Sequence, residues 1–352
     1  MNTKIIKIDH LNPKQEYLEE AASVISSGGL VIIPTETVYG IAANMSDAEA
    51  ITKLSEIKKR PKDKPFSLLI GKKEVIDNYA VDIPVCAYKF IERFWPGPLT
   101  LIFKSKSGGT IGMRMPDNEI ALGILNLAKV PVVCPSANLS GNPPPIDFES
   151  AIKGLNGFVD LAIDAGRVEL GVESSVVDLS GDKINILREA AIKKNEIEET
   201  ANKKTVLFIC TGNSCRSVMA QAQLIKRLKE KKRRDVEVLS AGIMMLAGSG
   251  ATEATRQVLL KEGMDVSSHS SQKITKEMLK KSDLILVMEQ LHEQRILQIA
   301  PELKNRVFLL KEFVKKRDTN LDIEDPIGQP IEFYEQVFAV IKEAVEKIIE
   351  II

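Results

Sequence analysis

The stretch TVLFICTGNSCRSVMAQAQLIKRL, residues 205–228, decides how the second half of the chain folds. Its first six residues suit a buried strand, and its last ten repeat apolar residues with helical spacing. The small and polar residues between them suit a tight loop. The order of strand, loop and helix places this loop at a helix N-terminus, where backbone N–H groups and the helix dipole attract an anion.

Two side chains of this stretch carry chemistry. Cys210 ends the predicted strand, and Arg216 follows six residues later, just before the predicted helix that starts after Ser217. A loop that binds anions also stabilises a thiolate, which is a strong nucleophile, and a planar guanidinium matches two oxygens of a phosphoryl group. Asp325, in the loop IEDPIGQP, is the candidate donor of a proton to the leaving group. The pattern predicts phosphoryl transfer to a cysteine.

Length and composition set the frame for this chemistry. A chain of 352 residues suits two domains with separate cores. Because 48 Lys and Arg residues balance 48 Asp and Glu residues, no global basic field indicates nucleic acid or a membrane surface. The first residues lack the apolar segment of a signal peptide, so we expect a cytoplasmic protein with no membrane partner. Four cysteines without a CxxC pair argue against a disulfide scaffold and a structural zinc site.

A charged, helix-prone segment at residues 191–204 marks a seam in the chain. We place the domain boundary there, which gives domains of residues 1–202 and 203–352. In the second domain the apolar runs TVLFIC, VEVLS, SDLILVM and RVFLL alternate with helical patterns. This alternation predicts an α/β fold with a doubly wound, four-stranded parallel sheet.

Four motifs of the second domain resemble the low-molecular-weight protein tyrosine phosphatase family. They are CTGNSCRS at 210–217, SAG at 240–242, SDLILVM at 282–288 and DP at 325–326. The resemblance implies that Cys210 is the nucleophile, Arg216 the phosphate clamp and Asp325 the general acid, with a phosphoprotein substrate and no cofactor. It assigns the phosphate loop to Thr211, Gly212, Asn213, Ser214, Cys215 and Ser217. Val218 departs from the proline that is usual in the family.

The substrate of this domain stays open between phosphotyrosine and phosphoarginine. Ser214 and Ile327 stand where tyrosine phosphatases of the family usually carry a bulky aliphatic residue and an aromatic residue, and a small hydroxyl residue at 214 resembles the bacterial protein-arginine-phosphatase branch. Arsenate reduction on this fold needs two further cysteines after SDLILV, and the sequence has none there. A phosphate-binding pseudoenzyme is the remaining alternative. Cys215 is either a packed thiol or a partner that traps oxidised Cys210 as a disulfide.

The first domain carries dispersed polar groups after predicted strands. Lys58 and Arg60 are two residues apart, and Pro61 favours an extended Arg60, so both cations face one site. Ser136 and Asn138 follow a strand with the same spacing of two. Such side chains suit a polyphosphate, since the sequence contains no GxxxxGK[ST] loop.

The order of the motifs PTETVYG, KKRP, FWPGPLT, MRMPD, PSANLSG and ESSVVD resembles the YrdC-like family of threonylcarbamoyl-AMP synthases over residues 1 to about 200. The resemblance implies a twisted open α/β sheet. It also implies a reaction in which ATP, with Mg²⁺, combines with L-threonine and bicarbonate to give threonylcarbamoyl-adenylate and diphosphate. A separate transferase complex then uses the adenylate to modify tRNA. A nucleotide- or RNA-binding module without catalysis is the alternative.

The same resemblance assigns binding residues in the first domain. Those for ATP are Lys58, Arg60, Ser136, Asn138, Ser174 and Arg188, and those for threonine are Thr35, Tyr39 and Arg114, with Arg114 also toward the phosphates. Two positions depart from the family pattern. Glu173 stands where proline is common, and Glu189-Ala190 follow Arg188 where Pro-Gly is usual.

Overall fold

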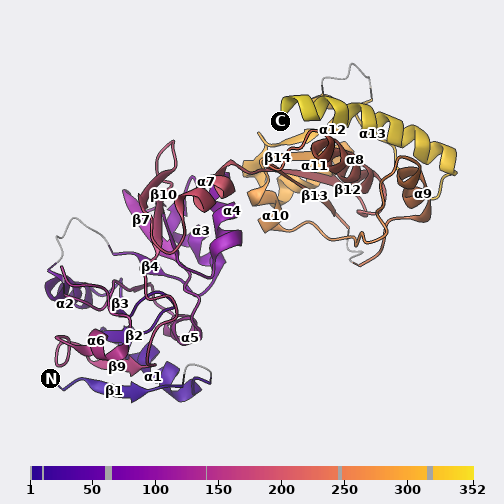
Figure 1. Ribbon diagram of the computed structural model, residues 1–352. Helices are drawn as coiled ribbons and strands as arrows, with labels where there is room; N and C mark the ends of the chain where they lie inside the picture. The colour runs from indigo at the N-terminus through magenta and orange to yellow at the C-terminus, as the bar shows by residue number, and fades with distance from the viewer. Residues whose placement is uncertain (1, 10–11, 60–65, 140, 245–247, 315–319) are drawn as a thin grey trace. The chain divides into compact units, whose positions relative to one another are not determined.

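The computed structural model describes residues 2–9, 12–59, 66–139, 141–244, 248–314 and 320–352. The chain divides into two compact units, residues 1–200 and 201–352, and each is described by itself (Figure 1). None of the helices in these ranges is long and apolar enough to span a membrane.

Unit 1 is built on a mixed sheet with the strand order β1-β9-β2-β3-β8-β4-β7-β6-β10-β11, and β5 pairs with β6. Parallel pairs (β1/β9, β2/β9, β4/β7, β6/β10) occur beside antiparallel ones. The strands are β1 (Lys4–Lys7), β2 (Val31–Ile33), β3 (Gly40–Asn44), β4 (Leu68–Leu69), β5 (Ala80–Val81), β6 (Leu99–Ser105), β7 (Thr110–Arg114), β8 (Val132–Val133), β9 (Leu161–Asp164), β10 (Ser175–Asp178) and β11 (Asn185–Arg188).

Helices cover both faces of the part of this sheet around β2. Successive side chains of a strand point to opposite faces, and here Val31 and Ile33 join one apolar cluster with α1 and α5, while Ile32 joins another with α2 and α6. This two-sided burial explains why β2 is wholly apolar. The helices are α1 (Gln15–Ser26), α2 (Ala48–Lys58), the 3₁₀ turn η1 (Lys73–Val75), α3 (Ile76–Tyr79), α4 (Val85–Phe94), α5 (Glu119–Ala128), α6 (Phe148–Ile152) and α7 (Lys194–Asn202).

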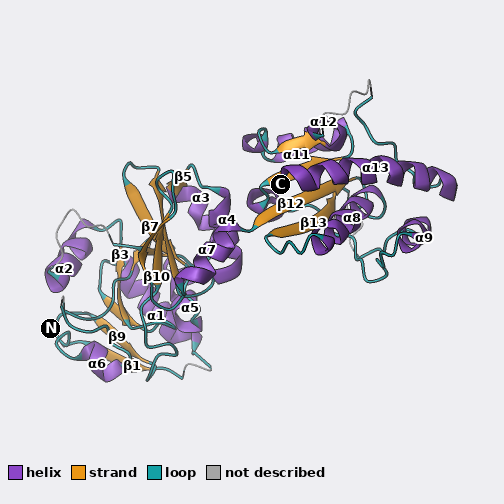
Figure 2. Ribbon diagram, turned by 45° about the horizontal axis from the view of Figure 1, so that its top comes forward, coloured by secondary structure: helices purple, strands orange, loops and turns teal. Residues whose placement is uncertain are grey.

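Unit 2 has a four-stranded, all-parallel sheet in the order β13-β12-β14-β15. Figure 2 shows its strands between helices. The strands are β12 (Lys204–Cys210), β13 (Val236–Gly242), β14 (Leu284–Val287) and β15 (Val307–Leu309). The helices are α8 (Arg216–Glu230), α9 (Glu253–Lys261), α10 (Lys276–Lys281), α11 (Gln290–Ile299), η2 (Pro301–Leu303), α12 (Leu310–Phe313) and α13 (Ile331–Ile351).

The central strand β12 again feeds two cores. Val206 and Phe208 pack with α8 and α13, and Leu207 and Ile209 pack with α10 and α11. Burial on both faces is typical of a parallel sheet covered by crossover helices. The predicted α/β fold of both halves, with a four-stranded parallel sheet in the second, is confirmed. The segment predicted as a connector forms α7, and β12 begins at Lys204.

Candidate functional sites

The predicted phosphate loop lies between the central strand β12 and helix α8. Cys210 is the last residue of β12, and Arg216 is the first residue of α8. Asn213 has a left-handed backbone, with φ of 54°. Gly242, at the end of β13, lets the loop approach closely, because a Cβ there would lie 2.8 Å from the Thr211 carbonyl oxygen. The loop is therefore seated on the carboxyl end of the sheet, where ligands bind in open α/β folds.

Asn213 fixes the shape of this loop. Its Nδ2 donates to Ser217 Oγ at 3.0 Å and to Ser240 Oγ at 2.8 Å, and its Oδ1 accepts from the Gln272 N–H at 3.0 Å. Its carbonyl oxygen contacts His269 Nε2 at 2.8 Å. Because all these groups are at least partly buried, the network holds a conformation that an asparagine tolerates better than most residues.

The Cys210 sulfur lies 3.0 Å from Ser217 Oγ and is nearly inaccessible to solvent, since the residue is 2% exposed. The Ser217 oxygen already accepts from Asn213 Nδ2, so its own O–H is available to donate to the sulfur. A hydroxyl donor and a helix N-terminus both stabilise a thiolate. This arrangement suits the nucleophilic role that the sequence assigns to Cys210.

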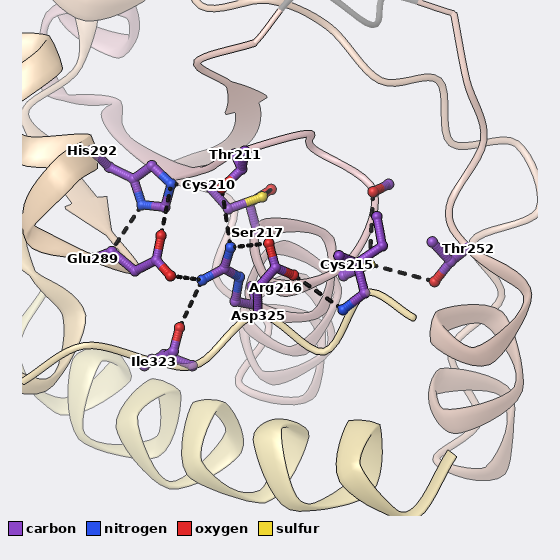
Figure 3. A network of polar contacts seen from close by, with 12 residues as sticks. Cys210, Thr211, Cys215, Arg216, Ser217, Thr252, Glu289, His292, Ile323 and Asp325 are labelled. Atoms are coloured by element: carbon purple, nitrogen blue, oxygen red, sulfur yellow. Dashed lines mark hydrogen bonds and ion pairs between the residues drawn. The ribbon is translucent and has the colours of Figure 1, made fainter. Parts of the chain in front are cut away.

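Arg216 is buried and its two Nη groups are fully engaged (Figure 3). Nη1 donates to the Ile323 carbonyl oxygen at 2.7 Å and pairs with Glu289 Oε1 at 2.8 Å. Nη2 donates to Thr211 Oγ1 at 3.1 Å and to Asp325 Oδ2 at 2.5 Å. The buried Nε has no hydrogen-bond partner among the described residues. The structure thus brings Arg216 and Asp325 together and leaves one guanidinium donor open to a ligand.

Glu289 and His292 belong to this network, although the sequence analysis did not select them. The His292 ring is fully buried at the start of α11, with Nδ1 3.1 Å from the Glu289 N–H and Nε2 3.0 Å from Thr211 Oγ1. Burial, helped by the charge of Arg216, lowers the pKa of His292 to about 4, so the ring is neutral at neutral pH. The spacing E-x-x-H in MEQLHEQ was the signal, since such a pair suits a helix N-terminus.

Cys215 points into a polar corner of its own. Its sulfur lies 3.5 Å from Thr252 Oγ1, 3.6 Å from Ser214 Oγ and 3.9 Å from the Tyr334 hydroxyl. Both Cys210 and Cys215 are free thiols. Ser214 is half-buried and Ile327 is exposed. Neither side chain carries an aromatic ring that could stack on a phenol.

In unit 1, a cavity of about 670 Å³ gathers the predicted binding residues. Arg60 lies outside the described residues. The others all line the cavity: Thr35, Tyr39, Lys58, Arg114, Ser136, Asn138, Ser174 and Arg188. They come from α2, β7, β11, the loop between β2 and β3, the loop after β8 and the loop before β10. Distant parts of the sequence therefore meet at one concave surface, as ligand sites usually require.

Lys58, the last residue of α2, links the two nucleotide motifs. Its Nζ donates to the carbonyl oxygens of Ser136 and Asn138 at 2.7 and 2.5 Å, and to Asn138 Oδ1 at 2.9 Å. Ser136 Oγ in turn donates to Asn138 Oδ1 at 2.6 Å. These contacts fix the end of the Lys58 side chain at the cavity wall, next to both polar motifs.

Arg114 is held by a buried carboxylate that the sequence analysis quoted only within PTETVYG. Its Nη2 lies 2.7 Å from Glu36 Oε1 and donates to Thr37 Oγ1 at 2.9 Å, while Nε donates to the Gly97 carbonyl oxygen at 3.2 Å. Glu36 is 3% exposed, and its oxygens accept no aligned hydrogen bond among the described residues. The ion pair with Arg114 is therefore what balances this buried charge.

Arg188 lies at another part of the wall, paired with Glu173. Its Nη1 donates to Glu173 Oε1 at 2.6 Å, and its Nε and Nη2 contact the Ser174 carbonyl and hydroxyl oxygens at 2.8 and 3.2 Å. The Ser174 hydroxyl also lies 2.9 Å from Thr100 Oγ1. Both partners of the pair are more than one-third exposed, so an anionic ligand competes with Glu173 for Arg188 at little cost.

Tyr39 and Cys134 line the same cavity with groups that stay uncharged. The Tyr39 hydroxyl donates to the Gly166 carbonyl oxygen at 2.8 Å and accepts from the Ala165 N–H at 3.1 Å. Burial raises the pKa of Tyr39 and that of Cys134 to about 12. Cys134 was not selected from the sequence. Its neutral thiol and the engaged Tyr39 hydroxyl leave the charge of the cavity to its cations and their partners.

Two family models match the chain. Residues 23–190 match the model described as telomere recombination, of the Sua5, YciO and YrdC proteins, and residues 205–352 match the low molecular weight phosphotyrosine protein phosphatase model. The two matches fall within units 1 and 2 and leave 191–204 between them.

Known proteins resemble each half. The threonylcarbamoyl-AMP synthase of Pyrococcus abyssi is 35% identical over 242 residues, 63% of this chain and 71% of that protein. The protein-arginine-phosphatase of Geobacillus stearothermophilus is 41% identical over 129 residues, 37% of this chain and 82% of that protein. A solved structure of a P. abyssi Sua5 variant superposes with a TM-score of 0.53 at 27% identity, covering 74% of this chain and 90% of that one. The chain therefore belongs to the threonylcarbamoyl-AMP synthase family through its first half and to the low-molecular-weight phosphotyrosine protein phosphatase family through its second.

Proposed function

We propose that this protein carries two enzymes, and that unit 1 makes L-threonylcarbamoyladenylate and diphosphate from ATP, L-threonine and bicarbonate. The observation that carries this proposal is the single cavity in which eight predicted binding residues meet. The relative from P. abyssi, named a threonylcarbamoyl-AMP synthase, supports it. The alternative of a binding module without catalysis is not favoured.

The charges of the cavity suit the nucleotide. Arg60 and Arg188 would contact the phosphates, and Lys58 would add its charge while it holds Ser136 and Asn138 in place. Ser136, Asn138 and Ser174 would hydrogen-bond the nucleotide, and the polar groups around Thr35 would hold the threonine. The carbamate formed from threonine and bicarbonate attacks the α-phosphorus, and diphosphate leaves. The residues position these reactants and neutralise charge, without a covalent enzyme intermediate.

We infer that Mg²⁺ enters with ATP. The ion keeps several waters and needs few protein ligands beside the phosphates, so ATP can carry it into the site. We further propose a cytoplasmic protein whose adenylate passes to a tRNA-modifying transferase complex. The test is incubation with ATP, threonine and bicarbonate. Diphosphate release that requires both cosubstrates, with the adenylate detected by mass, is expected, and release independent of threonine would contradict the proposal.

For unit 2 we propose cysteine-dependent dephosphorylation of a phosphoprotein. The observation that carries it is the meeting of Cys210, Arg216 and Asp325 around one loop, with Arg216 Nε left for a ligand. The Cys210 thiolate attacks phosphorus, and the leaving group takes a proton from Asp325. Water then hydrolyses the phosphocysteine. Arsenate reduction is not favoured, because the other two cysteines, Cys86 and Cys134, lie in unit 1.

We propose phosphoarginine as the preferred substrate of unit 2. The small Ser214 leaves room and a hydroxyl for the attacking water, the exposed Ile327 offers no ring to stack a phenol, and the relative from G. stearothermophilus is named a protein-arginine-phosphatase. The test compares kcat/KM on phosphoarginine and phosphotyrosine peptides for the native protein and Ser214→Ile. We expect the substitution to shift the ratio toward phosphotyrosine, and a native preference for phosphotyrosine that does not shift would contradict the proposal.

We also propose that the two units are independent domains divided near residue 202. The separate cores and the separate family matches support this division. Residues 1–202 and 203–352, produced as separate proteins, are expected to keep their own activities. Loss of both activities on separation would refute it.

A further inference from the structure

The hydroxyl of Thr211 has an unusual set of contacts for a residue next to the nucleophile. Its Oγ1 lies 3.1 Å from Arg216 Nη2, which can only donate, and 3.0 Å from His292 Nε2. Figure 3 shows Thr211, Arg216 and His292 in one network beside Cys210. The direction of the hydrogen bond to His292 therefore decides what the hydroxyl itself can do.

The other nitrogen of the His292 ring settles that direction. Nδ1 lies 3.1 Å from the backbone N–H of Glu289, and a backbone N–H can only donate, so Nδ1 carries no proton. The ring is neutral at neutral pH, with its pKa lowered to about 4 by burial. A neutral imidazole without a proton on Nδ1 carries it on Nε2, and His292 Nε2 donates to Thr211 Oγ1. Glu289 Oε2, at 3.4 Å, is a second and more distant acceptor for the same proton.

Thr211 Oγ1 thus accepts two hydrogen bonds, which fill both lone pairs of a hydroxyl oxygen. Its own O–H must then donate to a third group, and the described residues offer no acceptor for it. The same holds for Arg216 Nε, the buried donor without a partner. Two donors without an acceptor, the Thr211 hydroxyl and Arg216 Nε, therefore belong to the loop that begins at Cys210.

We propose that Thr211 is a catalytic residue whose hydroxyl donates to a phosphoryl oxygen of the substrate, and that His292 is the positioning residue that holds it in the donor orientation. The proposal rests on the phosphatase function of unit 2. A hydroxyl that is held as a donor before the substrate arrives stabilises charge on the phosphoryl oxygens without reorganisation during the reaction. His292 acts only through Thr211 and touches no substrate.

The first test is the tautomer of His292. The chain has three histidines, so long-range ¹H–¹⁵N spectra of the full-length protein at pH 7 resolve them, and His292→Asn identifies the signal. We expect the proton on Nε2. A proton on Nδ1 would overturn the proposal, because Thr211 would then have to donate to His292 and would have no proton for a ligand.

The second test removes the hydroxyl and keeps the shape of the side chain. Thr211→Val is compared with Thr211→Ser, which retains the hydroxyl, using p-nitrophenyl phosphate for turnover and inorganic phosphate for binding. We expect Thr211→Val to lose about tenfold in kcat/KM and to weaken phosphate binding, and Thr211→Ser to stay within about threefold of the native protein. Equal values for Thr211→Val and the native protein would overturn the proposal.

A double substitution separates positioning from structural support. If His292 acts through Thr211, Thr211→Val with His292→Asn loses no more activity than Thr211→Val alone. Additive losses would assign His292 a structural role only and overturn its part of the proposal. The native protein could bind phosphate better than Thr211→Val and yet hydrolyse neither a phosphoester nor phosphoarginine. That result would overturn the proposed phosphatase activity and still support the Thr211 hydroxyl as a hydrogen-bond donor.

Discussion

The two candidate anion-binding sites differ in where their residues lie along the sequence. In unit 2 the nucleophile, the guanidinium and the loop between them come from seven consecutive residues, 210–216, and the rest of the unit holds that loop in place. In unit 1 the cations come from the end of α2, from β7 and from β11, and meet only because the sheet brings them together. One site is local in sequence and the other depends on the tertiary fold.

The hydrogen-bond acceptors around the cations also differ between the two units. Arg216 is paired with two carboxylates, so a phosphoryl group must compete with charged acceptors for its Nη donors. In unit 1 Lys58 donates to the carbonyl oxygens of Ser136 and Asn138, whereas Arg114 and Arg188 each pair with one carboxylate. In the proposed mechanisms, unit 2 depends on one atom, the Cys210 sulfur, whereas unit 1 spreads binding over many contacts. Single substitutions should therefore have unequal effects in the two units.

The largest effect is expected for Cys210→Ser, since a serine hydroxyl does not ionise where a thiol does. We expect phosphatase turnover to fall by more than about a thousandfold, with threonine-dependent diphosphate release unchanged in the same full-length protein. Steady-state assays of both activities check this. Phosphatase activity that remains after the substitution would show that Cys210 is not the nucleophile. Unit 2 would then not depend on one atom, and the difference between the two sites would not hold.

The second largest effect is expected for Lys58→Ala, which removes one cation and its hydrogen bonds to Ser136 and Asn138. We expect about a hundredfold loss of threonine-dependent diphosphate release, in the range that one preorganised charged group contributes. The exposed Lys53 on the same helix provides the control Lys53→Ala, which should be unaffected. Equal activity in Lys58→Ala and the control would mean that this cation does not serve the nucleotide.

Glu36→Gln sharpens the comparison at the level of stability. The substitution leaves the buried Arg114 charge without its counter-ion, which should lower the free energy of unfolding of unit 1 by about 2 kcal/mol. The single tryptophan, Trp95, is buried in unit 1, so its fluorescence follows this transition selectively. The exposed Glu56 gives the control Glu56→Gln. An unchanged transition would show that Arg114 needs no counter-ion, contrary to the geometry.

The smallest effect is expected for Glu173→Gln, because the pair with Arg188 is largely exposed and weak. Freed from its carboxylate, Arg188 should bind the nucleotide phosphates better, and we expect the KM for ATP to fall by about threefold at low salt. Glu169→Gln, at a nearby exposed position, is the matched control. A rise in KM at fixed Mg²⁺ would instead assign Glu173 to the metal.

The same difference explains how much of each site could be predicted from the sequence. The motif from Cys210 to Arg216 could be recognised because its strand, loop and helix are adjacent in the sequence. The four-stranded sheet was predicted from the alternation of apolar runs with helical patterns. Asp325 is 109 residues from Arg216, and it was selected as a candidate proton donor by its chemistry and by the resemblance to a known family, not by its spacing. Periodicity carries no information about such a distance.

The residues that escaped the sequence analysis act on other residues. Glu36 balances Arg114 and has no spacing pattern of its own. The spacing E-x-x-H marks His292 at a helix N-terminus, but it does not show that His292 contacts Thr211. Both are polar groups buried by tertiary packing, so their importance emerges only when burial and partners are known. The mixed strand order of unit 1 was likewise out of reach, because pairs such as β1 with β9 join residues more than 150 positions apart.

The oxygens that accept hydrogen bonds from Lys58 have a consequence for the chemical stability of the enzyme. The proposed adenylate is a mixed anhydride, and a free amine beside it would be acylated. An ammonium that donates its protons to Ser136 O, Asn138 O and Asn138 Oδ1 has no lone pair with which to attack. In the proposed reaction, the contacts that hold the Lys58 ammonium would therefore also protect it from acylation by the product.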